Sequence, residues 1–241
     1  MKKPSWQCLR PARRHCLRKQ RNDMTNNLTL KTFTVNFIEE NCYVLSDATR
    51  EAVIVDCGAF FPEEQAAIRQ YVEEQQLDVR HLLCTHGHFD HVFGVQFIHD
   101  TYGILPEMCV DEVDTYRHSG EQMRQFLHRA LPLSLPEPGT TFTEGDVITF
   151  GTHTLRIIAT PGHTPGGVCF YCPEAGILLS GDSLFRREIG RCDLPGGSEP
   201  TLVKALKDKI VNALPADTTV YSGHGPATTV GEERQENYYL Q

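Results

Sequence analysis

The 241-residue sequence has no hydrophobic run approaching the roughly 18 residues that a membrane-spanning helix requires. Internal repeats and low-complexity tracts are also missing, which excludes a repeat architecture. The G-x-S-x-G motif of serine hydrolases and the G-x-x-x-x-G-K-S/T motif of phosphate-binding loops do not occur. We therefore expect a globular protein that does not enter a membrane and whose chemistry uses neither motif.

Acidic residues are scarce at the start of the chain and abundant in the rest. Residues 1–23 contain eight Lys or Arg and one acid, a net +7, whereas the remainder carries 15 basic and 30 acidic residues, a net −15. A body this acidic is not expected to bind nucleic acid. The basic segment lacks the apolar centre of a secretory signal, which leaves a disordered tail or a transit peptide. We expect residues 1–27 to be a disordered tail and residues 28–241 to form the folded domain.

Cysteine spacing typical of a disulfide framework is absent. The nine cysteines are odd in number and scattered, which predicts reduced thiols and a cytoplasmic location. Cys169 and Cys172 form a lone C-x-x-C pair. The surrounding GVCFYC has the pattern of a strand, in which residues three apart point to opposite faces. A shared metal or redox role for this pair is therefore not expected.

Short β-rich runs come in two groups, and helical patterns interrupt each group. The expected strands are 29–37, 41–47, 51–58, 81–85, 146–150, 153–160, 167–172, 176–181 and 219–225. The expected helices are 62–77, 91–103, 123–139, which runs into a Pro-rich loop, and 198–214, with Ser198 as its N-cap. This order favours an α/β (α+β) sandwich of sheets flanked by helices over one parallel sheet.

The segment THGHFDH, residues 85–91, contains three histidines and one aspartate directly after an apolar run. His86 and His88 are two residues apart, so in an extended segment both point to one side. Asp90 and His91 fall where the chain turns into a helix, and they can reach a second position nearby. The alternative is that Asp90 only caps the helix and the histidines are surface residues.

Three later strands end in the same way, with a ligand-type residue between glycines or other small residues. His163 lies in TPGHTPGG, Asp182 in LLSGDS and His224 in SGHG. Because strand ends in one sheet lie close together, these residues could converge with the first group. Imidazole and carboxylate are the ligands that hydrolytic zinc takes. Seven candidates are too many for one ion and suit two divalent metal ions, zinc or alternatively iron or manganese, that share a bridging carboxylate.

With these motifs, the sequence from Leu28 to Gln241 resembles the metallo-β-lactamase superfamily. The motifs that carry this resemblance are, in chain order, VDCG, which contains Asp56, then THGHFDH, TPGHTPGG, SGDSLF and SGHGP. The loop FRREIGRCDLPGG and the ending SGHGPATTVGEERQENYYL are similar to the short glyoxalase II-like (hydroxyacylglutathione hydrolase-like) group. The resemblance implies a four-layer αβ/βα sandwich with its site at one edge of the two sheets.

The resemblance also implies a role for each site residue. The first metal would be held by His86, His88 and His163, the second by Asp90, His91 and His224, with Asp182 as the bridge and Asp56 as an orienting residue behind the ligands. Asp90 would also orient the attacking hydroxide. The implied activity is hydrolysis of small thioesters, and the partner is a small-molecule substrate.

Two departures from glyoxalase II concern glutathione recognition rather than hydrolysis. The sequence ends 17 residues after His224, without the added C-terminal helical domain of that group. The loop Lys and Tyr that touch glutathione there align with Arg191 and Asp193 here, which leaves Arg191 as a candidate for binding a substrate carboxylate.

Two alternative functions are a mononuclear iron persulfide dioxygenase and a nuclease. The retained second-metal residues argue against the first, and the acidic body argues against the second. The oligomeric state stays open.

Overall fold

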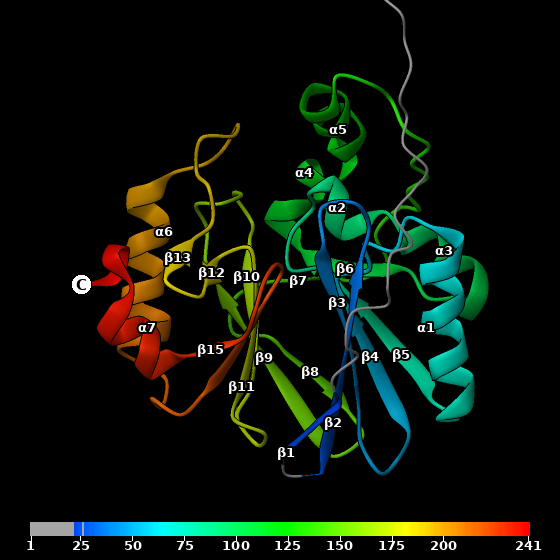
Figure 1. The fold of residues 1–241 in the computed structure, drawn as a ribbon, viewed down its shortest axis with the longest axis horizontal. Coiled ribbons are helices and arrows are strands. Elements are labelled where there is room, and N and C mark those ends of the chain that lie inside the picture. Colours follow the sequence, from blue (N-terminus) through cyan, green and yellow to red (C-terminus); the bar gives the residue numbers. More distant parts are fainter. Residues whose placement is uncertain (1–21, 26) are drawn as a thin grey trace, which may run out of the picture.

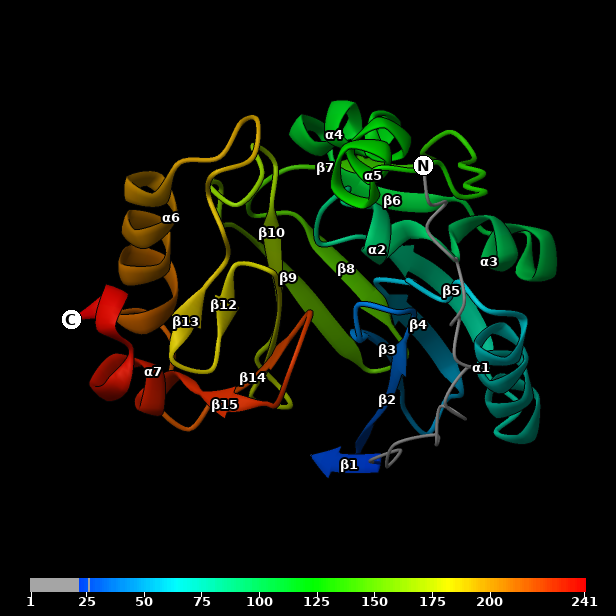
Figure 2. The same cartoon turned by 45° about the horizontal axis from the view of Figure 1, so that its top comes forward.

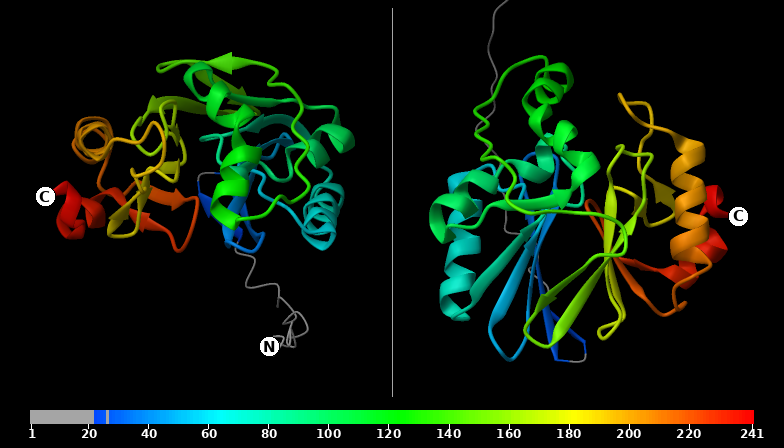
Figure 3. Two further views of the ribbon diagram at one scale, coloured as in Figure 1. Left: turned by 90° about the horizontal axis from the view of Figure 1, so that it is seen from above. Right: turned by 180° about the vertical axis from the view of Figure 1, so that it is seen from behind.

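The computed structural model describes residues 22–25 and 27–241, which form two β-sheets packed face to face with helices on both outer surfaces (Figure 1). The views from above and from behind show the same succession of helices, sheet, sheet and helices (Figure 3). This arrangement confirms the four-layer αβ/βα sandwich expected from the sequence. None of the helices in the described ranges has the length and apolar character needed to cross a bilayer.

The first sheet has seven strands in the order of the chain. They are β1 (Asn22–Thr25), β2 (Leu28–Val35), β3 (Glu40–Ser46), β4 (Glu51–Val55), β5 (Asp78–Leu83), β6 (Pro106–Cys109) and β7 (Thr141–Phe142). Pairing is antiparallel from β1 to β4 and parallel from β4 to β7. The carboxyl ends of β4 and β5 therefore share one edge of the sheet, and Asp56 and the THGHFDH segment follow directly there.

The second sheet has six strands in the order β15-β14-β11-β10-β9-β8. They are β8 (Val147–Phe150), β9 (His153–Ala159), β10 (Val168–Cys172), β11 (Ile177–Gly181), β14 (Thr219–Ser222) and β15 (Thr228–Thr229). Only β11 and β14 pair in parallel, so Asp182 and His224, which follow them, also share an edge. A small hairpin of β12 (Leu184–Phe185) and β13 (Glu188–Ile189) continues from β11.

Helices cover the outer face of each sheet. The first sheet carries α1 (Pro62–Glu74) and α3 (Val95–Tyr102). The second carries α6 (Glu199–Ala205), which continues as the π-helical turn η2 (Leu206–Val211), and then α7 (Val230–Glu236) and the 3₁₀ turn η3 (Tyr238–Leu240). At the edge with the candidate ligands, α2 (Phe89–Val92), the 3₁₀ turn η1 (Val110–Glu112), α4 (Val113–Arg117) and α5 (Ser119–Leu127) follow the strands of the first sheet. The tilted view shows α2, α4 and α5 gathered there (Figure 2).

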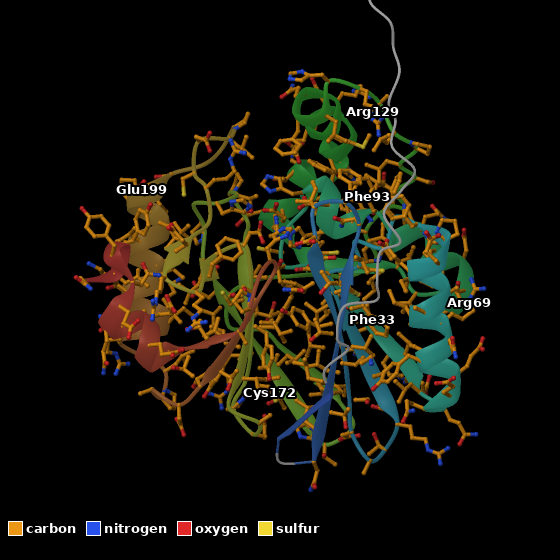
Figure 4. All side chains as sticks on the ribbon, viewed as in Figure 1. Phe33, Arg69, Phe93, Arg129, Cys172 and Glu199 are labelled. Carbon is orange, nitrogen blue, oxygen red and sulfur yellow. The ribbon has the colours of Figure 1, made fainter. Side chains whose placement is uncertain are left out.

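Alternation along the strands divides the apolar side chains among three layers. Val53 and Phe170 belong to the core between the two sheets, where side chains fill the space (Figure 4). Ile54, the next residue of β4, packs instead with the helices on the first sheet. On β10, Cys172 faces the inter-sheet core and Cys169 faces the helices on the second sheet. The predicted separation of this C-x-x-C pair onto opposite faces is therefore confirmed.

The helix expected over residues 91–103 is interrupted, and this part of the prediction is wrong. α2 ends at Val92 and α3 begins at Val95. The amide of Gly94 donates to the carbonyl of Cys57 at 2.8 Å, and the carbonyl of Asp90, which a continuous helix would pair with Gly94, accepts from Asn36 Nδ2 at 2.9 Å. Both groups are satisfied by another part of the fold, so the helix breaks there.

The boundary expected at residue 28 is too late. Asn22–Thr25 pair antiparallel with β2, from Asn22 opposite Lys31 to Thr25 opposite Leu28. The first sheet therefore begins inside the segment expected to be a disordered tail. Residues 1–21 and residue 26 lie outside the described residues. Strands β1, β6, β7, β12, β13 and β15 were not predicted from the sequence. Each has four residues or fewer, and a run this short gives only a weak pattern.

At the edge opposite the candidate ligands, Asp47 joins the two sheets. This residue follows β3, and its carboxylate accepts hydrogen bonds from the amide of Thr49 at 2.9 Å and from the amide and hydroxyl of Thr152 at 2.7 and 2.8 Å. Thr152 lies in the turn between β8 and β9. Burial alone would raise the pKa of Asp47, but these hydrogen bonds outweigh it and hold the pKa below its ordinary value.

We expect Asp47→Ala to lower the free energy of unfolding at pH 7 by about 1–2 kcal/mol, because the amides of Thr49 and Thr152, in turns of the two sheets, lose a charged acceptor that water replaces only in part. A carboxyl with a depressed folded-state pKa stabilises the fold above its unfolded pKa of about 3.9, and the difference from wild type should shrink as the pH falls below that value. Urea unfolding at several pH values measures this. The control Asp208→Ala removes a side chain that is 54% exposed and should change stability by less than about 0.5 kcal/mol. Equal losses in both variants would contradict the prediction.

Candidate metal centre

All seven residues predicted as ligands lie at one edge of the two sheets, each beyond the end of a strand. His86 and His88 follow β5, Asp90 and His91 are in α2, His163 is in the turn between β9 and β10, Asp182 follows β11, and His224 follows β14. Five of the seven are buried, and the side chains of Asp182 and His224 are 13% and 23% exposed. The alternative of isolated surface polar residues is therefore wrong.

The seven side chains form two triads with a carboxylate between them. Nitrogen atoms of His86, His88 and His163, the first triad, lie within 4.8 Å of one another, and so do ligand atoms of Asp90, His91 and His224, the second triad. Asp182 reaches both. Its Oδ2 lies 3.8 Å from His163 Nε2 and 3.7 Å from His224 Nε2, and its Oδ1 lies 3.3 Å from His91 Nε2. The arrangement matches two ligand sets that share a bridge.

Hydrogen bonds on the protein side turn the histidine rings toward the centre. Nδ1 of His86 donates to Thr85 Oγ1 (3.0 Å), that of His91 to Asp56 Oδ2 (3.1 Å), that of His163 to the carbonyl of Arg191 (2.7 Å), and that of His224 to the carbonyl of Glu39 (3.3 Å). A neutral imidazole that donates from Nδ1 keeps its lone pair on Nε2. Four of the five histidines therefore present a ligand atom in the tautomer that a metal needs.

The inward-facing atoms have no other partner. Nε2 of His86, His91 and His163 and Oδ1 of Asp182 are buried and make no hydrogen bond. Leaving a buried polar atom unsatisfied costs about 1–3 kcal/mol, so four such atoms at one point need an explanation. Divalent cations would satisfy all four, and the nitrogen and oxygen donors suit zinc or iron. The residues present therefore fit a two-metal centre.

The electrostatics of the cluster also favour cations. Burial, together with the neighbouring histidines, lowers the pKa of His86 and brings that of His88 to about 3, so both rings are neutral at pH 7. Burial would also lower the pKa of His91, but the carboxylates of Asp182, Asp56 and Asp90 outweigh it and raise the pKa well above its ordinary value. The carboxylates around His91 therefore stabilise a positive charge at this point. A divalent ion would supply that charge in place of a proton on the His91 ring.

Asp56 has the position expected of an orienting residue. Its Oδ1 accepts from the amide of Thr85 at 2.7 Å, and its Oδ2 accepts from the Thr85 hydroxyl at 2.6 Å and from His91 Nδ1. Asp56 therefore holds the strand end that leads into His86 and also orients His91. The residue has a positive φ of 50°, a conformation that is uncommon for residues other than glycine.

Two features behind the ligands were not predicted. Glu40 is fully buried, with Oε1 at 3.9 Å from His91 Nδ1 and Oε2 accepting from the amide of Gly58. Asn41 Nδ2 donates to the carbonyls of Ser222 and Gly225 at 3.1 and 3.0 Å, which ties β3 of the first sheet to the loop that carries His224. Neither residue lies in a recognisable motif, and a polar residue at a strand start carries no signal of burial.

Arg191, the candidate for binding a substrate carboxylate, is already paired. Its guanidinium donates to both carboxylate oxygens of Asp193 at 2.8 and 2.7 Å, and its side chain is 49% exposed. Its backbone carbonyl, by contrast, accepts from the ligand-type residue His163. The backbone of Arg191 therefore contributes to the centre directly, while its side chain would have to exchange partners to bind a substrate.

Comparison with known proteins gives the same architecture. The family model of the metallo-beta-lactamase superfamily matches residues 35–224, which include all seven ligand-type residues. The hydroxyacylglutathione hydrolase GloC of Haemophilus influenzae is 30% identical over 215 residues, a match that covers 88% of this chain and 98% of that protein.

Two solved structures are also similar. The B3 metallo-beta-lactamase BLEG-1 has a TM-score of 0.80 and 34% identity, covering 88% of this chain and 99% of its own. TTHA1623, solved in a di-iron-bound form, has a TM-score of 0.76 and 32% identity, covering 87% and 99%. These matches confirm the fold, and the di-iron form supports binding of divalent metal by such a centre.

Proposed function

The chain belongs to the metallo-β-lactamase superfamily of metal-dependent hydrolases, and from this premise we propose that it is a dinuclear hydrolase of small thioesters. The observation that carries the proposal is the pair of triads with Asp182 between them. The two bound cations, zinc or alternatively iron or manganese, would activate a water molecule at neutral pH and polarise the substrate carbonyl.

Within this mechanism the residues of the chain position the reactants. Asp90 Oδ2 faces His224 Nε2 at 3.2 Å, which leaves its other carboxylate oxygen able to accept a hydrogen bond from the attacking water and so to orient it. Departure of a thiolate needs little help from a general acid, because a thiol has a pKa of only about 8.5. A site rich in ligands and without an obvious proton donor therefore suits a thioester better than an amide.

The same geometry supports acceptance of thioesters with different thiol portions. In the glyoxalase II-like group a loop Lys and Tyr touch glutathione, and here the matching positions hold Arg191, already paired, and its partner Asp193. We therefore propose that the substrates are small thioesters in general, with hydroxyacyl-glutathione adducts among them. The proposal includes a reducing compartment such as the cytoplasm, because the seven cysteines of the described residues are free.

We expect kcat/KM for lactoyl-glutathione to lie within about tenfold of that for the same acyl group on a truncated thiol, because a single remaining contact through Arg191 is worth about 1.4 kcal/mol. Steady-state kinetics on both substrates tests this. A preference of several hundredfold for the glutathione adduct would show that another surface recognises it.

A second candidate activity, β-lactam hydrolysis, is favoured by the 34% identity with BLEG-1. A chromogenic β-lactam measured beside the thioesters separates the two proposals. Turnover of the β-lactam with no thioester hydrolysis would overturn the thioesterase proposal in favour of β-lactam hydrolysis.

The dioxygenase alternative is tested by oxygen consumption with a persulfide substrate. The complete second triad supports hydrolysis over that reaction.

A further inference from the structure

Glu112, the last residue of η1, is a buried carboxylate that the mechanism does not use. Its side chain is completely inaccessible. Its Oε1 accepts from the amide of Gly87 at 2.9 Å, and its Oε2 accepts from the amide of Gly166 at 2.8 Å. One carboxylate therefore holds two backbone amides that are 79 residues apart in the chain. These two hydrogen bonds fix the positions of both amides, and they favour the ionised form of a carboxyl whose pKa burial raises to about 7.

The two amides belong to the two segments that carry the first triad. Gly87 stands between His86 and His88, and Gly166 lies three residues after His163. The segment of His86 and His88 extends from β5 of the first sheet, whereas that of His163 joins β9 and β10 of the second. Glu112 thus connects the two sheets at the point where their ligands must meet.

Both glycines are needed for this contact. A Cβ atom added to Gly87 would lie 2.4 Å from the backbone nitrogen of Tyr116, and one added to Gly166 would lie 2.4 Å from that of Glu112. The segment from η1 to α4 therefore packs directly on the backbone of both ligand segments. Any side chain at either position would push that segment and its carboxylate away from the amides.

We propose that Glu112 is a positioning residue for the first triad: it sets the distance between the His86–His88 pair and His163, and through that distance the affinity for the metal ion of this triad. The inference rests on the metal centre of the proposed function but not on its substrate. Glu112 lies outside the second triad, whose residues are held instead by Asp56, Asn36 and the carbonyl of Glu39.

The decisive variant is Glu112→Gln, which keeps the size of the side chain. Its amide oxygen can accept from one glycine, but its NH₂ group points a donor at the other amide, so one ligand segment loses its anchor. We expect affinity for the first-triad metal to fall by about 10–100-fold, the usual effect of changing a residue that orients ligands. Affinity at the second triad should change by less than about threefold, which is within ordinary surface-mutation effects.

The measurement is titration of metal-free protein with Zn²⁺ in competition with a chromophoric chelator, repeated with Co²⁺ so that the visible spectrum reports the geometry of each site. Neither readout needs a substrate, so a failure of the thioester proposal would leave the result interpretable. Glu112→Asp serves as the second variant if Glu112→Gln does not fold, because the shorter side chain keeps the carboxyl group but cannot span both amides.

Glu233→Gln is the matched control. Glu233 is also completely buried, and it accepts from the amide of Arg187 and from Asn237 Nδ2, both at 2.8 Å, on the side of α7 and the β12–β13 hairpin. It should lower the melting temperature without altering zinc affinity or the cobalt spectrum. Wild-type affinity at both sites in the folded Glu112 variants, or an equal loss of affinity in Glu233→Gln, would overturn the proposal.

Discussion

Asp182→Ala is expected to remove one of the two metal ions and to lower kcat/KM by well over 100-fold, because changing residues that only orient ligands already costs about 10–100-fold. Asp182 is the carboxylate that comes within 4 Å of ring nitrogens in both triads. Its loss would take a ligand from each ion and leave two divalent cations facing each other without the anion that screens their repulsion. Metal analysis of the purified variant and steady-state kinetics measure the two effects.

The control is Asp193→Ala, which removes a carboxylate from the loop that follows β13. The Asp193 side chain is 68% exposed and pairs with the Arg191 guanidinium. The His163 contact is to the backbone carbonyl of Arg191, which the substitution leaves in place. Metal content should stay at the wild-type value, and kcat should change by less than about threefold, as for other exposed positions. Comparable metal loss in both variants would refute the bridging role of Asp182.

Stripping the metal ions with a chelator is expected to abolish hydrolysis, and two equivalents per chain should restore it. The apoprotein should also be much less stable. Binding at 1,000 times the dissociation constant stabilises a fold by about 4 kcal/mol per site, which for a domain of this size corresponds to roughly 10 °C in melting temperature. The reason is visible in the four buried ligand atoms that otherwise lack partners.

Titration of the apoprotein with zinc, followed by both activity and thermal melting, tests the stoichiometry. The dinuclear mechanism predicts that activity rises until two equivalents are bound. Full activity at one equivalent, with no further rise in the melting temperature, would contradict it. Magnesium added at the same concentration is a suitable control, because the imidazole-rich triads offer it few of the oxygen ligands it prefers.

The sequence by itself determined the residues of the candidate centre, because that information is local. THGHFDH follows the apolar run HLLC, and His163, Asp182 and His224 each follow an apolar strand and a glycine, as in LLSGDS and SGHG. Parallel pairing of β4 with β5 and of β11 with β14 then brings these ends to one edge of the sandwich. The two-sheet architecture was indicated in the same way, since β-rich runs in two groups, interrupted by helical patterns, can be read along the chain.

The tertiary structure alone decided which polar residues support that centre. Glu112 meets its two amides at separations of 25 and 54 residues, and Asn41 meets the His224 loop at more than 180. No local pattern marks such partners, because a single acid or amide in an unremarkable segment becomes buried only when distant segments close around it. The break between α2 and α3 has the same origin, since the carbonyl of Cys57 and the side chain of Asn36 bind the backbone groups that a continuous helix would pair. Short-range periodicity encodes the elements and their ends, whereas long-range hydrogen bonds, formed only on folding, set the geometry of the site.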